Sequence, residues 1–275
     1  MKSILCVWDM ARATEQVLLT VDSHVEAPNW HPNGTSLLVN GSGRLLHLPL
    51  DNPQLVPVDT HFASRCNNDH GISPDGQHIV LCHHTGRGSE IFLMPATGGT
   101  PTPVTTHAPS WWHGWSPGGH TLAYVGARGG SRVVDVFTIP VTGGTETRLT
   151  HGEGHCDGPD FSADGKRIYY NCDRAGHAQI WVMDADGANQ RMLFADDCVN
   201  WFPHPSPCGR HLVYLAYPPG TLGHPANLPV ALVLCKPDGT HRRRILEFTG
   251  GQGTINVPSW RADGGAFAYV RYEDA

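Results

Sequence analysis

The sequence predicts an all-β protein: a six-bladed β-propeller built from four-stranded antiparallel blades. One observation is a glycine-containing turn that recurs 42 to 55 residues apart along the chain. Another is that several short strands follow each of these turns. A period in the forties with four strands per repeat is typical of propeller blades. The glycines that mark the six predicted blade centres are Gly34, Gly76, Gly119, Gly165, Gly209 and Gly264.

The repeat is clearest between Phe161 and Phe194. A Ser-x-Asp-Gly turn is followed by a β-rich run at 167–171, a turn-prone patch and a second β-rich run at 180–184. Asp186-Gly187 and a last apolar pair complete the unit. Short runs rich in β-formers and joined through Asp-Gly turns indicate a β-meander rather than helices.

The third observation is that the sixth repeat is incomplete at the end of the chain. It stops after its second strand, at 266–272, whereas 3–9 and 15–20 match the third and fourth strands of the other repeats. We therefore expect the N-terminus to complete the last blade and close the ring, which leaves no free sheet edge. The prediction is one propeller domain over residues 1–275.

Composition and charge indicate which partners, compartment and cysteine state to expect. Of 275 residues 40% are hydrophobic, and the formal charge of −6 argues against nucleic acid as a partner. No apolar run is long enough for a signal peptide or a membrane span, so a cytoplasmic protein without a membrane partner is expected. The eight cysteines form no Cys-x-x-Cys pair, and Cys82, Cys172 and Cys235 lie in apolar strand runs, which predicts reduced, buried thiols.

One face of the disc is predicted to carry a ligand site. The connections between strands two and three, and between successive blades, meet there, and the first position of each innermost strand is rich in carboxylates, amides and indoles. Such groups suit a carbohydrate, which offers an apolar face and a hydroxyl rim. The alternative is a solvated channel whose polar side chains bind strand ends and water. The candidate ligand-binding residues are Glu26, Asn68, Asp69, Trp111, Trp112, Asp157, Asn171, Asp173, Arg174, Asn200, Trp201, His204 and Asn256.

Histidine is over-represented, with 18 residues. Four of them, His70, His83, His84 and His113, are expected near Asp69 at this mouth. Imidazoles beside a carboxylate suit a divalent metal such as zinc, manganese or iron. The alternative is a site without any cofactor.

Several motifs resemble the repeats of the TolB-like β-propellers, which are also of the type found in oligogalacturonate lyases and prolyl-oligopeptidase propeller domains. They are ISPDG, FSADGKRIYY, IWVMDADG and VPSWRADG, and the resemblance covers essentially the whole chain. In the lyases a metal at the channel mouth is held by His and Gln. The resemblance therefore implies that Gln252 completes a metal set with the four histidines above.

These observations favour binding of a small polar ligand or oligosaccharide. If the protein is an enzyme, the expected reaction is lyase-like: a metal polarises a uronate carboxylate while His70 or His113 removes the adjacent proton. The alternative is a non-catalytic scaffold with a protein partner; the oligomeric state stays open. The insertion at 217–228 lies on the same face and is expected to form a lid, a rim or a subunit contact.

Overall fold

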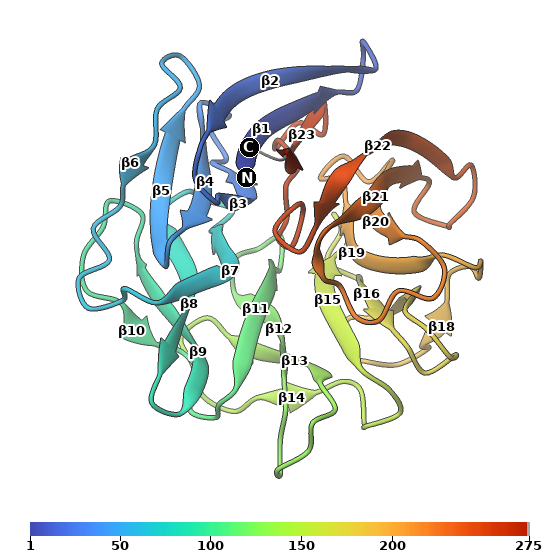
Figure 1. The fold of residues 1–275 in the computed structure, drawn as a ribbon. Helices are drawn as coiled ribbons and strands as arrows, with labels where there is room; N and C mark the ends of the chain where they lie inside the picture. Colours follow the sequence, from blue (N-terminus) through green and yellow to red (C-terminus); the bar gives the residue numbers. More distant parts are fainter. Residues whose placement is uncertain (274–275) are drawn as a thin grey trace.

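The computed structural model describes residues 1–273 and arranges 23 β-strands in six antiparallel sheets around a common axis (Figure 1). No α-helix occurs among the described residues. The predicted all-β, six-bladed propeller is confirmed. The period of the turns identified it because each turn joins the two inner strands of one blade.

Five blades follow one another along the chain, with strands in sequence order from the axis outward. Blade 1 consists of β3 (Glu26–Trp30), β4 (Ser36–Gly41), β5 (Arg44–Pro49) and β6 (Val56–Pro57). Blade 2 consists of β7 (Cys66–Ile72), β8 (His78–Thr85), β9 (Gly88–Pro95) and β10 (Thr102–Pro103). Blade 3 consists of β11 (Ser110–Trp115), β12 (Thr121–Gly126), β13 (Asp135–Pro140) and β14 (Thr147–Arg148). Blade 4 consists of β15 (Cys156–Phe161), β16 (Arg167–Cys172), β17 (Gln179–Asp184) and β18 (Arg191–Met192). Blade 5 consists of β19 (Val199–Pro205), β20 (Leu212–Tyr217), β21 (Ala226–Cys235) and β22 (Arg243–Gly251).

The sixth blade joins the two ends of the chain, as the sequence predicts. β1 (Lys2–Asp9) lies between β2 (Thr14–Val21) and β23 (Ala266–Glu273). Lys2 opposes Glu273 and Asp9 opposes Ala266, so β1 pairs with β23 along its whole length. The innermost segment of this blade is reduced to one bridge, between Trp260 and Phe267.

The hydrophobic core is divided among the interfaces between blades and does not form one central cluster. The described residues form six apolar clusters, and most members of each come from two neighbouring blades. Leu5 and Cys6 of β1, for example, are fully buried on opposite sides of the sixth blade. Each blade is therefore apolar on both faces, which explains the continuous burial of strands such as β4 and β20.

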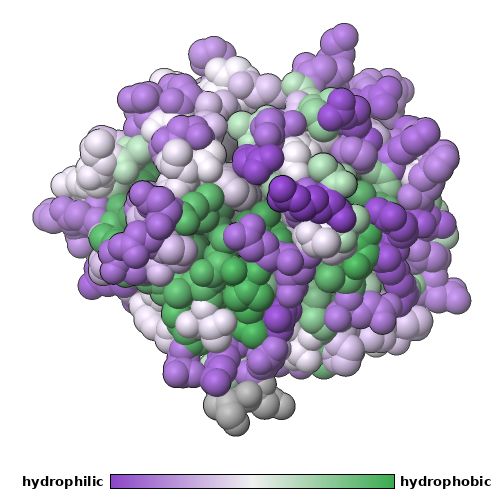
Figure 2. Space-filling model, turned by 90° about the horizontal axis from the view of Figure 1, so that it is seen from above, coloured by the Kyte–Doolittle hydropathy of each residue, from purple (hydrophilic) through white to green (hydrophobic). Residues whose placement is uncertain are grey.

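The outer edge of the disc at β2 and β22 has mixed polarity. Apolar surface there gathers in areas separated by charged and polar groups (Figure 2). Partly buried residues of both strands, among them Leu18 and Phe248, pack onto the clusters beneath. Among residues 1–273 no helix is long and apolar enough to span a membrane.

One cysteine expectation is wrong. Cys172 is not a free thiol but forms a disulfide with Cys156. The two residues are directly opposed across β15 and β16, which brings their Cα atoms to 4.0 Å. Sequence spacing alone does not show this, because cross-strand register depends on a bulge between them. Cys82 and Cys235 are buried free thiols, as expected.

Candidate functional site

A polar cavity of about 350 Å³ lies at the end of the channel where the inner strands begin. Its walls come from blades 2 to 5 and from the segment that precedes the innermost part of blade 6. Amides, carboxylates and imidazoles dominate it, with a few apolar groups. The lining residues are Asn67, Asn68, Asp69, His84, Trp111, His113, Val125, Val134, His155, Asp157, Phe202, His224, Gln252 and Asn256. We call it the mouth cavity.

An ion pair between His113 and Asp157 stands in this cavity. His113 Nε2 lies 2.9 Å from Asp157 Oδ1, and His113 Nδ1 lies 3.2 Å from the Asn256 carbonyl oxygen. Burial by itself would lower the pKa of His113, but the Asp157 carboxylate outweighs it and raises that pKa to about 9. Burial likewise opposes ionisation of Asp157, yet His113 holds its pKa well below the usual range. The pair is therefore charged at neutral pH.

Asp69 is the second carboxylate of the mouth cavity and behaves differently. Its Oδ2 accepts a hydrogen bond of 2.8 Å from Asn67 Nδ2, whereas Asp157 has the direct ion pair with His113. Burial raises the pKa of Asp69 to about 7, despite the opposing effect of His113. Two carboxylates in one cavity thus differ in charge state because only Asp157 has a direct cationic partner.

The insertion after β20 brings a third imidazole to Asp157. His224 Nε2 and His155 Nε2 lie 3.8 and 3.9 Å from Asp157 Oδ2. Burial lowers the pKa of His224, whereas contact with Asp157 raises the pKa of His155. The His224 ring packs against Trp201, with ring centroids 4.4 Å apart. The insertion therefore forms part of the wall of the site.

An outer cavity of about 530 Å³ adjoins the mouth cavity. The two share His155, His224 and Gln252 as lining residues. Asp173 and Trp201, both predicted ligand residues, line the outer cavity. His155 N donates to Asp173 Oδ1 at 2.7 Å, so Asp173 also holds the loop that carries His155.

A β-bulge near the start of the inner strand sets the directions of these side chains. The register shifts by one residue in blades 1, 3, 4 and 5, for example between Asp157 and Asp160, and by two residues in blade 2. In three blades the extra residue has a left-handed backbone: Ala27 at φ 57°, Gly158 at 58° and Phe202 at 54°. The two-residue alternation of a regular strand is therefore interrupted at the mouth.

Asn171 supports one such bulge instead of facing the cavity. It is fully buried, and its Oδ1 accepts a hydrogen bond of 3.0 Å from Phe202 N. The structure thus places this predicted ligand residue in the wall between blades 4 and 5.

Several other predicted ligand residues also lie away from the mouth cavity. Asn200 is buried against Gln179 and Asp196, and Arg174 stacks over Trp181 at 3.7 Å. His204 lies deeper in the channel, with Nδ1 3.0 Å from Asp160 Oδ2. Trp112 is buried and lines the opposite end of the channel, and Glu26 stands just outside the cavity lining, 3.5 Å from Asn68 Nδ2.

The five residues expected to hold a metal do not come together. His70 is fully buried with Nε2 3.4 Å from the Leu38 carbonyl oxygen, and its pKa falls to about 4 mainly through burial. His83 accepts from Arg65 N and packs edge-on to Phe92. Only His84, His113 and Gln252 reach the mouth cavity. Within residues 1–273 no group of three or more His, Cys, Asp or Glu side chains is arranged to hold a metal ion, so the residues do not fit the expected set.

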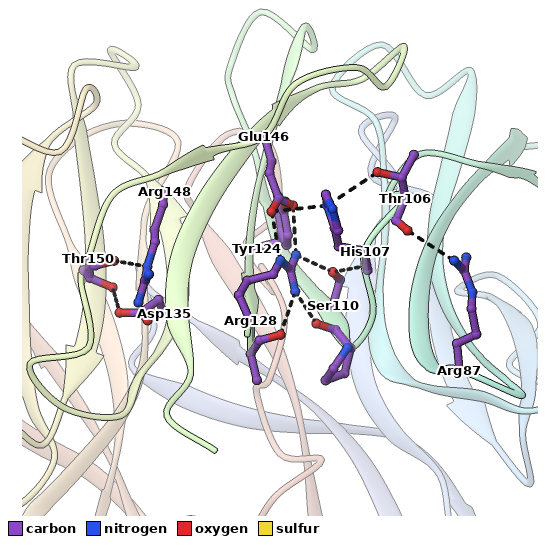
Figure 3. A network of polar contacts seen from close by, with 12 residues as sticks. Arg87, Thr106, His107, Ser110, Tyr124, Arg128, Asp135, Glu146, Arg148 and Thr150 are labelled. Carbon is purple, nitrogen blue, oxygen red and sulfur yellow. Dashed lines mark hydrogen bonds and ion pairs between the residues drawn. The ribbon is translucent and has the colours of Figure 1, made fainter. Parts of the chain in front are cut away.

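A charged network outside the cavity holds the blade 3 wall in place (Figure 3). Arg128 follows β12 and binds both carboxylate oxygens of Glu146 at 2.9 Å. It also donates to the Pro109 carbonyl oxygen at 2.7 Å and to Ser110 Oγ at 2.9 Å. Ser110 begins the strand that carries Trp111 and His113, so Arg128 fixes the start of this strand.

Phe202 was expected beside Trp201 at this mouth, but sequence reasoning missed three polar members of the site: Asn67, His155 and His224. His155 could have been found from its position two residues before Asp157 in an extended segment. The insertion had been noted, but nothing in its sequence shows that His224 folds inward.

Comparison with known proteins agrees with this architecture. The model of the TolB beta propeller domain matches residues 72–227, more than half of the chain. An uncharacterised protein of Agrobacterium fabrum is 43% identical over 274 residues, which covers 99% of this chain and 93% of that protein. The chain belongs to the TolB β-propeller family.

Two solved structures are similar to this protein in fold. A TolB-like structure from Agrobacterium tumefaciens is 43% identical, has a TM-score of 0.97, and covers 100% of this chain and 99% of its own. An oligogalacturonate lyase in complex with manganese is 14% identical with a TM-score of 0.60, covering 95% of this chain and 76% of that chain. The second likeness shows the shared fold alone.

Proposed function

We propose that this TolB-family propeller binds a small polar ligand of the carbohydrate class in the mouth cavity. The observation that carries the proposal is the convergence of side chains from four blades and the segment before blade 6 on one cavity. A cavity of about 350 Å³ is in the range of small-molecule sites, which span roughly 300–1,000 Å³.

The lining offers both kinds of contact that a sugar ring requires. Asp157, Asn68 and Gln252 provide donors and acceptors for hydroxyl groups. Trp111 and Phe202 provide apolar surface for the face of the ring. Because Asp157 keeps its charge, a hydrogen bond from a hydroxyl group to it is of the stronger, charge-assisted kind.

We propose binding rather than proton abstraction as the role of His113. A general base must be unprotonated, whereas the ion pair with Asp157 keeps His113 protonated at neutral pH. His70 is enclosed by protein on all sides and has no path to a ligand in the mouth cavity. No metal-dependent step is included, because the histidines do not form a metal set.

The test is a screen of the purified full chain on an array of neutral and acidic mono- and oligosaccharides, followed by calorimetry on the best binder. Asp157→Asn should weaken that binding at least tenfold, since a hydrogen bond to a charged group contributes roughly 1.5–3 kcal/mol. Asn68→Ala is a second variant that leaves the ion pair intact, and it should weaken binding as well.

Glu247→Gln serves as the control, because Glu247 is exposed on β22 at the outer edge of blade 5. It should bind like the wild type. Binding that is equal in all three variants would place the carbohydrate elsewhere. A chain that binds no member of the array would contradict the proposal and favour the scaffold reading.

A further inference from the structure

The opposite end of the channel carries a second cavity of about 320 Å³, which we call the aromatic well. It lies where the inner strands end, beside the Ser-x-Asp-Gly turns, and shares no lining residue with the mouth cavity. Bulky residues of this region, among them Trp30 and Trp260, belong to the apolar clusters between blades. The structure shows that they also line an open site.

Two rings of apolar residues build the well, each with one member from every blade. The inner ring lies four residues before each marker glycine and the outer rim lies two residues before it. The inner ring is Trp30, Ile72, Trp115, Phe161, Pro205 and Trp260, and the rim is Pro32, Pro74, Pro117, Ala163, Pro207 and Ala262. All twelve line the cavity, so the sequence repeat itself produces the apolar wall.

The lining also contains two buried polar side chains, one of them a carboxylate. Asn29 uses both of its amide atoms within the protein, donating to the Pro258 carbonyl oxygen and accepting from Ile72 N. Asp160 Oδ2 lies 3.0 Å from His204 Nδ1, and Asp160 is 6% exposed. Asp160 is the only acidic residue that lines this mainly apolar, aromatic cavity.

Five aromatic residues line the well, four from the inner ring together with Trp112, and one carboxylate stands among them; aromatic rings and a carboxylate are the groups that recognise an organic cation. The π-face of an indole attracts a positive charge, and quaternary ammonium groups are bound by such aromatic cages. A guanidinium already exploits one of these rings at the edge of the well: Arg261 lies 6.0 Å from the centroid of Trp30. The ion-pair partner of Arg261 is Asp263, two residues further along the same turn.

We propose that the aromatic well is a binding site for a small quaternary ammonium compound. The methylated cation would contact Trp30, Trp115, Trp260 and Phe161, and Asp160 would supply the opposing charge. The compact apolar methyl groups suit the proline and alanine rim, which offers few donors to a hydrated ammonium. This site is separate from the mouth cavity and does not depend on the function proposed there.

The experiment titrates the full chain with choline and with its neutral carbon isostere, 3,3-dimethylbutan-1-ol, following tryptophan fluorescence and calorimetry. The two probes share shape and differ in charge. Choline should give saturable binding, and the isostere should bind at least tenfold more weakly. Equal binding of both probes would mean an apolar site without cation recognition, and no saturation with choline by about 10 mM would overturn the proposal.

Two variants locate the site. Trp115→Phe should weaken choline binding about tenfold, because the indole is the strongest cation–π partner and Trp115 Nε1 has no hydrogen-bond partner to lose. Asp160→Asn keeps the shape and removes the charge, and it should also weaken choline binding. Trp111→Phe, in the mouth cavity, is the matched control and should bind choline like the wild type. Weakening by Trp111→Phe with none by Trp115→Phe would overturn the assignment to the well.

Discussion

Asp69 shows how burial changes the pKa of a single carboxyl group. In an unfolded chain the pKa of its carboxyl would be near the ordinary value of 3.8, but in the folded chain burial raises this pKa to about 7. Below pH 3.8 the group is protonated in both states and does not affect stability. Between these two values only the unfolded state loses the proton, so stability falls as pH rises, and the loss is complete above pH 7.

Asp69→Asn should therefore stabilise the protein relative to the wild type at pH 8 and much less at pH 4. The expected difference between the two conditions is on the order of 2–4 kcal/mol. Urea unfolding at both pH values measures it. Asp186→Asn, in an exposed turn, is the matched control and should show the same small effect at both. A constant effect of Asp69→Asn would mean that Asp69 is ionised in the folded state.

The bulged inner strand is the element that positions the site. Ala27, Gly158 and Phe202 occupy the same left-handed position in three blades, although only one of them is glycine. The left-handed conformation costs an L-residue roughly 1–2 kcal/mol, which glycine avoids. Blade 4 uses glycine there because a Cβ atom would lie 2.9 Å from Asn171 Oδ1.

Gly158→Ala should consequently destabilise the protein by about 1–2 kcal/mol or more, through backbone strain and this close contact. Ala27→Gly should be neutral or stabilising by up to about 1 kcal/mol, because it removes strain at the cost of unfolded-state entropy. Urea unfolding of the two variants checks both signs. If Ala27→Gly lowered the free energy of unfolding as much as Gly158→Ala does, the left-handed backbone of the bulge would not be the cause of the destabilisation.

The bulge also marks the limit of what the sequence predicts. Turn glycines at a regular spacing were sufficient for the blades, the strand order and the closure of the ring, because each depends on local patterns. Asp157 and Asn68 reach the mouth cavity from the first residues of inner strands, and Asn256 reaches it from the segment before blade 6. His70 and His204 follow the register shifts of β7 and β19 and are buried against backbone carbonyl oxygens, whereas Asn171 lies on β16 and holds the neighbouring bulge through Phe202 N. His224 could not be predicted, since its position depends on how a loop folds back onto Trp201.

At the scale of the whole molecule, stability depends on closing the ring through β1. Among residues 1–273, β1 is the only strand that pairs with β2; it is also the outer partner of β23, and its residues Leu5 and Cys6 are completely buried. Deleting residues 1–9 would open blade 6 and expose the apolar surfaces of blades 1 and 5. Exposed strand edges and apolar faces lead to aggregation. We therefore expect the truncated chain to lose its cooperative unfolding transition and to aggregate on size-exclusion chromatography.

A circular permutant separates the effect of β1 from that of chain length. Lys2 and Glu273 are register partners, so a short linker can join the two ends, and new ends can be placed between Gly220 and Thr221 in the exposed part of the insertion. The permutant keeps every strand pair and should unfold cooperatively, with a circular dichroism spectrum like that of the wild type. A truncated chain that remained a folded monomer would show that five complete blades suffice, and a permutant that failed to fold would show that the insertion, not β1, holds the ring. The order of stability expected from the pairing is wild type, then permutant, then truncation.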